Sequence, residues 1–155
     1  MAGARASGTR TGWDMAATLD VRLDNDLAEI HRLSEMVEQF GEGNALPDRA
    51  VFNLNLCLDE LITNIVGYAY GDEGRHSIRV RLTLDSGLLR TEVEDDGRPF
   101  NPLDAPPPDL ESDLETREIG GLGLHFVKTL MDTVAYERDG AFNRLVMTAR
   151  VEKVA

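Results

Sequence analysis

The sequence predicts an α+β domain, a two-layer α/β sandwich in which helices pack on one face of a mixed, largely antiparallel sheet. Short segments alternate apolar and polar residues, as strands do, whereas longer segments repeat apolar residues at helical spacing. These segments follow one another as strand, helix, helix, strand, strand, loop, helix, strand, strand. The chain has 155 residues, of which 42% are hydrophobic, and this suits one compact domain with one core.

The amino-terminal part is predicted to form a strand and two helices. In residues 18–23 (TLDVRL), apolar and polar side chains alternate as in a half-buried strand. A helix follows, with Asn25 as its N-cap and a stop in the glycine-containing stretch 41–44 (GEGN). A second helix is predicted to begin near Pro47, a residue favoured in the first helical turn, and to continue up to Gly71.

Two strands come next, at 77–84 (SIRVRLTL) and 88–95 (LLRTEVED), joined by a short turn (DSG). Their alternation predicts one buried face and one face in contact with solvent. Asp95 falls on the same face as Val93, which is the side of the core. A carboxylate on that side needs a partner.

The carboxyl-terminal part is predicted to contain a long loop, a helix and a hairpin. Residues 98–119 hold five of the six prolines and many acidic residues, which indicates an irregular loop, and loops of this length are commonly functional or disordered. A helix is predicted within 120–132 (GGLGLHFVKTLMD), and the last two strands flank the turn dipeptide Asp139-Gly140.

Charge and composition argue against several classes of protein. The chain has 16 Lys and Arg against 28 Asp and Glu, a net charge of −12, so direct nucleic-acid binding is not expected. A single cysteine, Cys57, supports neither a disulfide framework nor a metal site. No apolar run approaches the roughly 20 residues that span a bilayer, and the start of the chain lacks the apolar stretch of a signal peptide. We therefore expect a cytoplasmic protein without a membrane partner, with a flexible tail at 1–14 and a single domain at 15–155.

Polar residues interrupt the second predicted helix at 59–66 (DELITNIV). Glu60 and Asn64 lie four residues apart and therefore share one face. One interpretation is the solvated edge of an amphipathic helix. The other is a site in which Asn64 offers a neutral oxygen to Mg²⁺, whose remaining ligands are phosphate oxygens and waters, while Glu60 acts as a general base.

Two further stretches contain the residue types of a nucleotide site. In Asp95-Asp96-Gly97, the first carboxylate could accept a hydrogen bond from an exocyclic amine such as that of adenine, and the glycine would let a ring or a water approach the backbone. The alternative interpretation is an ordinary turn. The run 120–123 (GGLG) enters a helix and could present backbone N–H groups to phosphates, or could act as a flexible hinge.

Three stretches resemble, in this order, the N box, the D-x-G box and the glycine box of the ATPase superfamily that includes gyrase B, Hsp90, histidine kinases and MutL. They are ELITNIVGYAY (60–70), DDGRPFNP (95–102) and GGLGLHFVK (120–128). Within that superfamily the short chain most resembles the anti-sigma-factor serine/threonine kinases of bacterial sporulation and general stress control. The resemblance covers about residues 18–151. It implies a Bergerat-type, histidine-kinase-like ATP-binding fold with an ATP lid at about 98–119.

The resemblance also implies roles for individual residues. Asn64 would hold Mg²⁺, Glu60 would be the catalytic base, and Asp95 would bind the adenine amine of ATP or ADP, with Gly97 packed beside it. The residues that would line the triphosphate are Gly121, Leu122 and Gly123.

Partners follow from the same resemblance. In such kinases the γ-phosphate of ATP goes to an anti-anti-sigma (STAS-domain) protein, and the kinase sequesters a sigma factor in its other complex. Relatives are often homodimers, and the outer sheet face with Val146 is the expected contact. Two alternatives stay open: a non-catalytic nucleotide-gated interaction module, and the catalytic domain of a histidine kinase, for which His31 is the upstream histidine but no separate helical hairpin domain is evident to carry a phosphoacceptor.

Overall fold

The computed structural model describes residues 16–71, 74–101 and 121–152, so the predicted tail and most of the predicted loop lie outside the described residues. The described strands are β1 (Ala17–Asp24), β2 (Ser77–Asp85), β3 (Leu88–Asp95), β4 (Thr133–Asp139) and β5 (Phe142–Arg150). The described helices are α1 (Glu29–Gly43), α2 (Asp48–Tyr68) and α3 (Gly121–Leu130).

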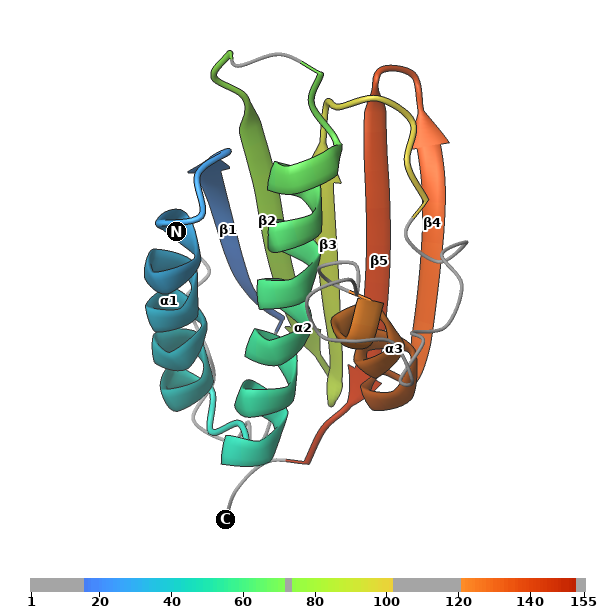
Figure 1. Ribbon diagram of the computed structural model, residues 1–155. Coiled ribbons are helices and arrows are strands. Elements are labelled where there is room, and N and C mark those ends of the chain that lie inside the picture. The colour runs from blue at the N-terminus through green and yellow to red at the C-terminus, as the bar shows by residue number, and fades with distance from the viewer. Residues whose placement is uncertain (1–15, 72–73, 102–120, 153–155) are drawn as a thin grey trace.

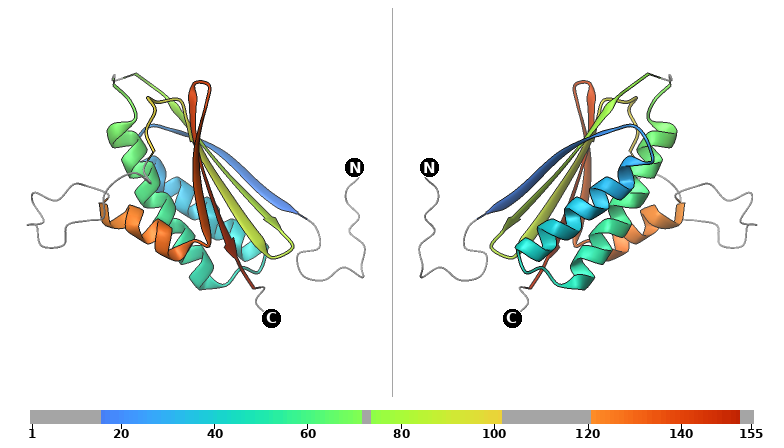
Figure 2. Two further views of the ribbon diagram at one scale, coloured as in Figure 1. Left: turned by 90° about the vertical axis from the view of Figure 1, so that its right-hand side faces the viewer. Right: turned by 90° about the vertical axis from the view of Figure 1, so that its left-hand side faces the viewer.

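The strands form one sheet in the order β1-β2-β3-β5-β4. Each of its pairings is antiparallel, so the described sheet has no parallel pair, although we had expected a mixed, largely antiparallel one. The reason is that β5 lies between β3 and β4, and it separates two strands that run in the same direction. All three helices cover one face of the sheet (Figures 1 and 2), which confirms the predicted two-layer α+β architecture.

The core lies between the helices and the inward face of the sheet. Inward positions alternate with exposed or half-buried ones along β1, β2 and β3, as the sequence pattern predicts. Cys57 of α2 is fully buried there, and its burial raises the pKa of the thiol to about 11, so the single cysteine is an inert core residue. Other fully buried core side chains are Leu33, Val37, Leu54, Leu58, Ile62, Ile78, Val80, Leu82, Leu84 and Met147.

The predicted N-cap of the first helix is wrong. The helix α1 begins at Glu29, and Asn25 instead connects two distant segments: its Oδ1 accepts a bond from the His76 N–H (2.9 Å), and its Nδ2 donates to the Gly74 carbonyl (3.2 Å). Because this amide is used to hold the chain that enters β2, it does not cap the helix.

The helix α2 begins directly after Pro47 and ends at Tyr68, three residues before the predicted end at Gly71. The carbonyl of Ala69, just past the helix, accepts a bond from the Arg98 N–H (2.9 Å). The end of α2 is therefore joined to the chain that leaves β3. No helix in the described part of the chain is long and apolar enough to cross a membrane.

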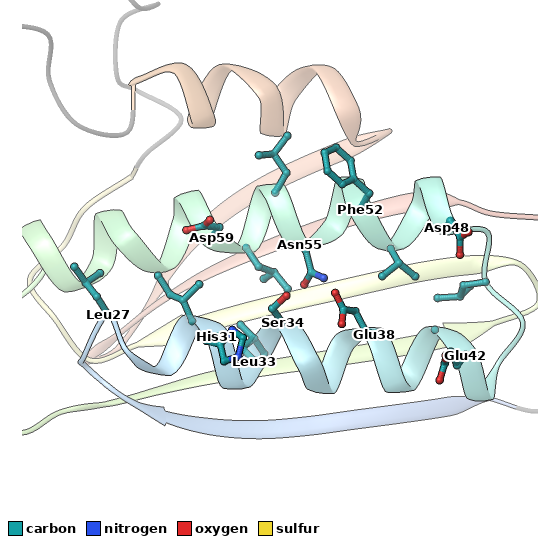
Figure 3. A pocket seen from close by; sticks show the side chains of 16 residues that line it. Leu27, His31, Leu33, Ser34, Glu38, Glu42, Asp48, Phe52, Asn55 and Asp59 are labelled. Atoms are coloured by element: carbon teal, nitrogen blue, oxygen red, sulfur yellow. The ribbon is translucent and has the colours of Figure 1, made fainter. Parts of the chain in front are cut away.

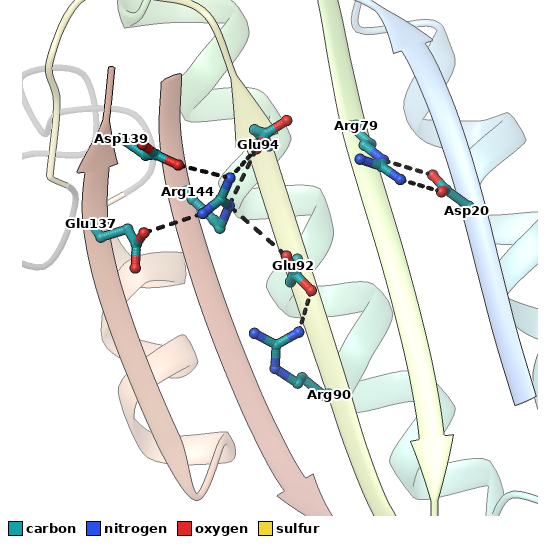
Figure 4. A network of polar contacts seen from close by, with 8 residues as sticks. All are labelled: Asp20, Arg79, Arg90, Glu92, Glu94, Glu137, Asp139 and Arg144. Carbon is teal, nitrogen blue, oxygen red and sulfur yellow. Dashed lines mark hydrogen bonds and ion pairs between the residues drawn. The ribbon is translucent and has the colours of Figure 1, made fainter. Parts of the chain in front are cut away.

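The outer face of the sheet carries charged side chains in pairs (Figure 4). Asp20 accepts two bonds from Arg79, at 3.0 and 2.6 Å. Arg144 donates to Glu94 (2.8 Å) and to Glu137 (3.1 Å). This face is therefore polar and faces solvent, as the strand alternation predicts.

Candidate functional site

The polar pair on α2 is directed inward. Asn64 is only 4% exposed, and its Nδ2 donates to the backbone carbonyl of Glu60 (2.8 Å) and to Glu60 Oε2 (3.0 Å). Burial raises the pKa of Glu60, against the smaller opposing effect of the bond from Asn64. The solvated-edge interpretation therefore fails for this pair, because one member is buried and the other is half-buried.

Two other polar residues of α2, Asn55 and Asp59, face elsewhere. Asn55 and Asp59 line an open groove of about 880 Å³ between α1 and α2 (Figure 3). Asp59 also accepts a hydrogen bond from Thr63 Oγ1 (3.4 Å). Neighbouring carboxylates on α2 thus point to different surroundings, with Glu60 next to Asn64 and Asp59 at the groove.

Asp95 lies at the inward end of β3 and is 4% exposed. Its Oδ1 accepts bonds from the Gly97 N–H (2.8 Å) and from Asn143 Nδ2 (2.9 Å). Burial raises the pKa of this carboxyl, and the two hydrogen bonds partly oppose that rise. Since both bonds that Asp95 makes with described residues use Oδ1, Oδ2 is the oxygen that is left for a further donor.

Asn64 and Asp95 line the same cavity, which encloses about 20 Å³, room for roughly one water molecule. Phe100 also lines it, and the Phe100 ring lies 6.5 Å from the ring of Tyr68 at the end of α2. The remaining lining residues are Leu61, Ile65, Val93, Tyr136, Asn143 and Leu145. The structure therefore brings two of the three predicted motifs, those of Asn64 and Asp95, to one cavity. Glu60 does not line the cavity but bonds Asn64, which does.

The chemistry of the pair fits a cation held mainly by phosphates and water. Both bonds that Asn64 makes with described residues use Nδ2, so its Oδ1 is the neutral oxygen that remains for a hard cation. Within residues 16–71, 74–101 and 121–152, no three His, Cys, Asp or Glu side chains cluster as a metal cage. A cation here would therefore depend on its ligand for most of its coordination.

Sequence reasoning missed Asn143, which is 4% exposed and bonds Asp95 across the sheet. It stands at an inward position of β5, in step with Leu145 and Met147, where the alternation calls for an apolar residue. The same signal identified Asp95 and could have identified Asn143.

The family follows from comparison with known proteins. The family model for the histidine kinase-like ATPase domain matches residues 23–149. The chain belongs to the histidine kinase-like ATPase domain family. The predicted superfamily is thereby confirmed.

Relatives of this ATPase domain include kinases. The serine/threonine-protein kinase BtrW of Bordetella bronchiseptica is 30% identical over 101 residues, which cover 65% of this chain and 71% of that kinase. The serine-protein kinase RsbW of Listeria monocytogenes is 32% identical over 108 residues, 67% of this chain and 68% of that kinase. These names agree with the predicted resemblance to anti-sigma-factor serine kinases.

A solved structure confirms the fold of the ATPase domain. The crystal structure of the RsbU and RsbW domains of Rv1364c from Mycobacterium tuberculosis superimposes with a TM-score of 0.63 at 17% identity. The match covers 90% of this chain and 34% of that longer chain.

Gly97 of the ATPase domain has a packing role that we did not predict. A Cβ atom at this position would lie 2.5 Å from the Ala69 carbonyl oxygen and 2.6 Å from the Ala69 Cβ. The space at this α-carbon is therefore filled by the end of α2, and glycine is needed for that close approach. The predicted contact of Gly97 with a nucleotide stays a prediction.

The Gly97→Ala variant is expected to lower the free energy of unfolding by about 1–3 kcal/mol, because the methyl group meets backbone atoms that cannot rotate away. Gly67→Ala is the matched control, since no atom of the described part of the chain lies within 4 Å of a Cβ there. It lies inside α2 and should gain roughly 0.5–1 kcal/mol. Urea denaturation of both variants checks this, and equal stability of Gly97→Ala and wild type would contradict the contact.

The glycine box of the ATPase domain is only partly described. The helix α3 begins at Gly121 and packs beside α2 on the same face of the sheet (Figure 1), with Val127 fully buried. The side chain of Leu122 and the surroundings of Gly121 and Gly123 lie outside the described residues, as do residues 102–119 of the predicted lid. Their roles stay predictions.

Proposed function

We propose that this chain is an ATP-dependent serine/threonine protein kinase of the anti-sigma-factor type, which phosphorylates an anti-anti-sigma partner and reversibly sequesters a sigma factor. The observation that carries the proposal is the cavity shared by Asn64 and Asp95, with Glu60 bonded to Asn64. The identity to BtrW and RsbW supports the choice of a kinase over other ATPases of the family.

Within this proposal, the described residues have distinct roles. Asp95 Oδ2 accepts a hydrogen bond from the adenine amine, and the buried position excludes competing water. Asn64 Oδ1 holds Mg²⁺, which supplies charge neutralisation for the phosphates when it is bound. Backbone groups of residues 121–123, at the start of α3, receive the phosphates of ATP or ADP.

Phosphoryl transfer requires an aligned acceptor hydroxyl. The hydroxyl oxygen attacks the γ-phosphorus, the bond to the β–γ bridging oxygen breaks, ADP leaves, and the hydroxyl proton passes to Glu60. Burial raises the pKa of Glu60, and a raised pKa makes this carboxylate a stronger base for the hydroxyl proton. Its bond from Asn64 fixes the orientation of the carboxylate relative to the cation ligand.

The proposed partners are proteins. We assign a STAS-domain anti-anti-sigma protein as phosphate acceptor and a sigma factor as the sequestered partner, in the cytoplasm, without direct contact to nucleic acid or membrane. The net charge of −12 agrees with protein partners rather than a polyanion. A homodimer would use the outer sheet face, where Val146 pairs with Ala135 and Glu92 in the strand register.

The first test is a calorimetric titration of ATP with and without Mg²⁺. Wild type is expected to bind ATP more tightly with Mg²⁺, and Asn64→Ala should lose that gain, with Mg-ATP binding weaker by at least about tenfold, which corresponds to about 1.4 kcal/mol. Asn55→Ala is the matched control, because Asn55 is on the same helix but lines the groove. Each variant is first checked for a wild-type thermal transition, and absence of ATP binding by nucleotide-free wild type would overturn the proposal.

One observation favours a second candidate, a non-catalytic nucleotide-gated interaction module. Glu60 Oε2 already accepts a bond from Asn64, so one oxygen of the proposed base is engaged. A single-turnover assay with a STAS-domain acceptor separates the two candidates, since only a kinase transfers the labelled γ-phosphate. Nucleotide affinity alone does not distinguish them.

A further inference from the structure

The side chain of Asn143 bonds several segments around the cavity and not Asp95 alone. It faces Asp95 directly in the register of β3 and β5. Its Nδ2 donates to Asp95 Oδ1 (2.9 Å) and to the Arg98 carbonyl (2.8 Å). Its Oδ1 accepts from the Phe100 N–H (3.2 Å), from Arg138 Nη1 (3.2 Å) and from the Tyr136 hydroxyl.

The two ends of the Asn143 side-chain amide have hydrogen-bond partners of opposite kinds. Both groups at Nδ2, a carboxylate and a carbonyl, only accept hydrogen bonds. The backbone N–H and the guanidinium at Oδ1 only donate, and the Tyr136 hydroxyl donates there as well. An amide satisfies both sets at once, whereas a carboxylate at this position would bring an acceptor against Asp95 and Arg98, and an apolar side chain would satisfy neither set.

Charge is arranged around Asp95 in the same network. Arg138 Nη1 donates to the Gly97 carbonyl (2.7 Å) as well as to Asn143 Oδ1. Asn143 therefore links the guanidinium of Arg138 to the carboxylate of Asp95. Among the described residues, Arg138 favours ionised Asp95, and Asp96 opposes it. Burial raises the pKa of the Tyr70 phenol, in the segment after α2, and the charge of Asp95 adds to this rise.

We propose that Asn143 is the positioning residue of the nucleotide site, which binds Asp95 Oδ1 and so orients the carboxylate with Oδ2 directed to the adenine amine. Its bonds to Arg98 and Phe100 fix the turn after β3 against the same amide. The inference rests on the proposed nucleotide site and goes beyond it, since it assigns adenine selectivity to a residue outside the three boxes.

The test measures ADP and GDP affinity of the full chain with Mg²⁺ from pH 5 to pH 9. In wild type, ionised Asp95 accepts from the amine of adenine and repels the carbonyl oxygen that guanine has in its place, so ADP binds more tightly than GDP. The Asn143→Leu variant is expected to bind ADP about 10- to 100-fold more weakly at pH 7, the loss expected for hydrogen bonds to a charged group. GDP affinity should change less, so the ADP-to-GDP ratio should fall.

The pH profile separates positioning from general damage to the fold. Loss of the donor at Nδ2 raises the pKa of Asp95 further, so the pH at which ADP binding is half-lost should move upward in Asn143→Leu. In Asn143→Asp it should move further, because two carboxylates then share one site. Arg138→Gln, at an exposed position, should also move it upward and provides a variant that is expected to fold.

Asn44→Ala is the matched control, an asparagine that bonds the Phe40 carbonyl (2.9 Å) at the end of α1, far from the cavity in sequence and fold. It should leave the ratio and the pH midpoint unchanged. Suppose that wild type binds ADP, but that Asn143→Leu and Arg138→Gln keep both the wild-type ratio of ADP to GDP affinity and the wild-type pH of half-lost ADP binding. The inference is then overturned, and the nucleotide site stands. If wild type binds no nucleotide, both the inference and the proposed function fail.

Discussion

The Glu60→Gln variant is expected to transfer phosphate about 10²- to 10⁴-fold more slowly than wild type, the contribution typical of a general base. Glutamine keeps an acceptor oxygen for Asn64 Nδ2 but cannot take up the proton of the acceptor hydroxyl. Affinity for Mg-ATP should stay within a few-fold of wild type, because the cavity is lined by Asn64 and Asp95 rather than by Glu60. Single-turnover transfer and calorimetric binding, measured on the same preparation, check both parts.

Asp59→Asn is the matched control for this variant. The control removes a carboxylate from the adjacent residue of α2, which lines the groove towards α1 and bonds Thr63 instead. It should leave transfer unchanged. The rate of wild type should also rise with pH through a pKa that burial raises above the ordinary value of a glutamate, and Glu60→Gln should lose this rise. A Glu60→Gln variant that loses ATP binding, or that transfers at the wild-type rate, would show that the role of Glu60 is not that of a base.

The Asp95→Asn variant is expected to weaken ATP binding by about 100-fold or more, because a hydrogen bond to a charged acceptor contributes about 1.5–3 kcal/mol and its loss leaves facing donors unpaired. In the variant, the side-chain oxygen of the asparagine keeps the bonds from the Gly97 N–H and from Asn143 Nδ2. Its NH₂ group therefore faces the adenine amine, and two donors meet. Competition binding with ATP and GTP checks this, and wild-type ATP affinity would contradict the role of Asp95.

The same variant should be at least as stable as wild type at neutral pH. Burial raises the pKa of Asp95 in the folded protein, so its contribution to stability is present at low pH and is lost as pH rises through that raised pKa. An asparagine at this position does not titrate, so the stability of Asp95→Asn relative to wild type should increase with pH across that window. Thermal melts from acid to neutral pH measure this, and they separate loss of binding from loss of folding.

Much of the fold was predictable because it depends on local periodicity. The alternation in β2 and β3 placed both strands correctly and put Asp95 on the inward face. The spacing of Glu60 and Asn64 placed them together on α2, where they bond. Each of these predictions needed only the geometry of a single element.

What failed depends on partners far away in the chain. Asn25 has the right residue type for an N-cap, but its side chain bonds the chain before β2, about 50 residues away. The packing of Gly97 against Ala69 was likewise not predicted, because these two residues are 28 positions apart in the chain, whereas its predicted contact with a nucleotide stays a prediction. Asn143 was missed since its five partners among the described residues come from β3, from β4 and from the turn after β3, and no short window contains them.

The sheet order also has a consequence for how the cavity forms during folding. β2 and β3 are joined by a tight turn at Ser86 and Gly87, and β4 and β5 by another at Gly140, so each pair can close as a local hairpin. Asp95 and Asn143 belong to different hairpins and are 48 residues apart, so the cavity is complete only after the two hairpins have joined along β3 and β5. A ligand that contacts both β3 and β5 therefore stabilises their pairing against local opening. It should slow the amide hydrogen exchange of β3 and β5 more than that of β1.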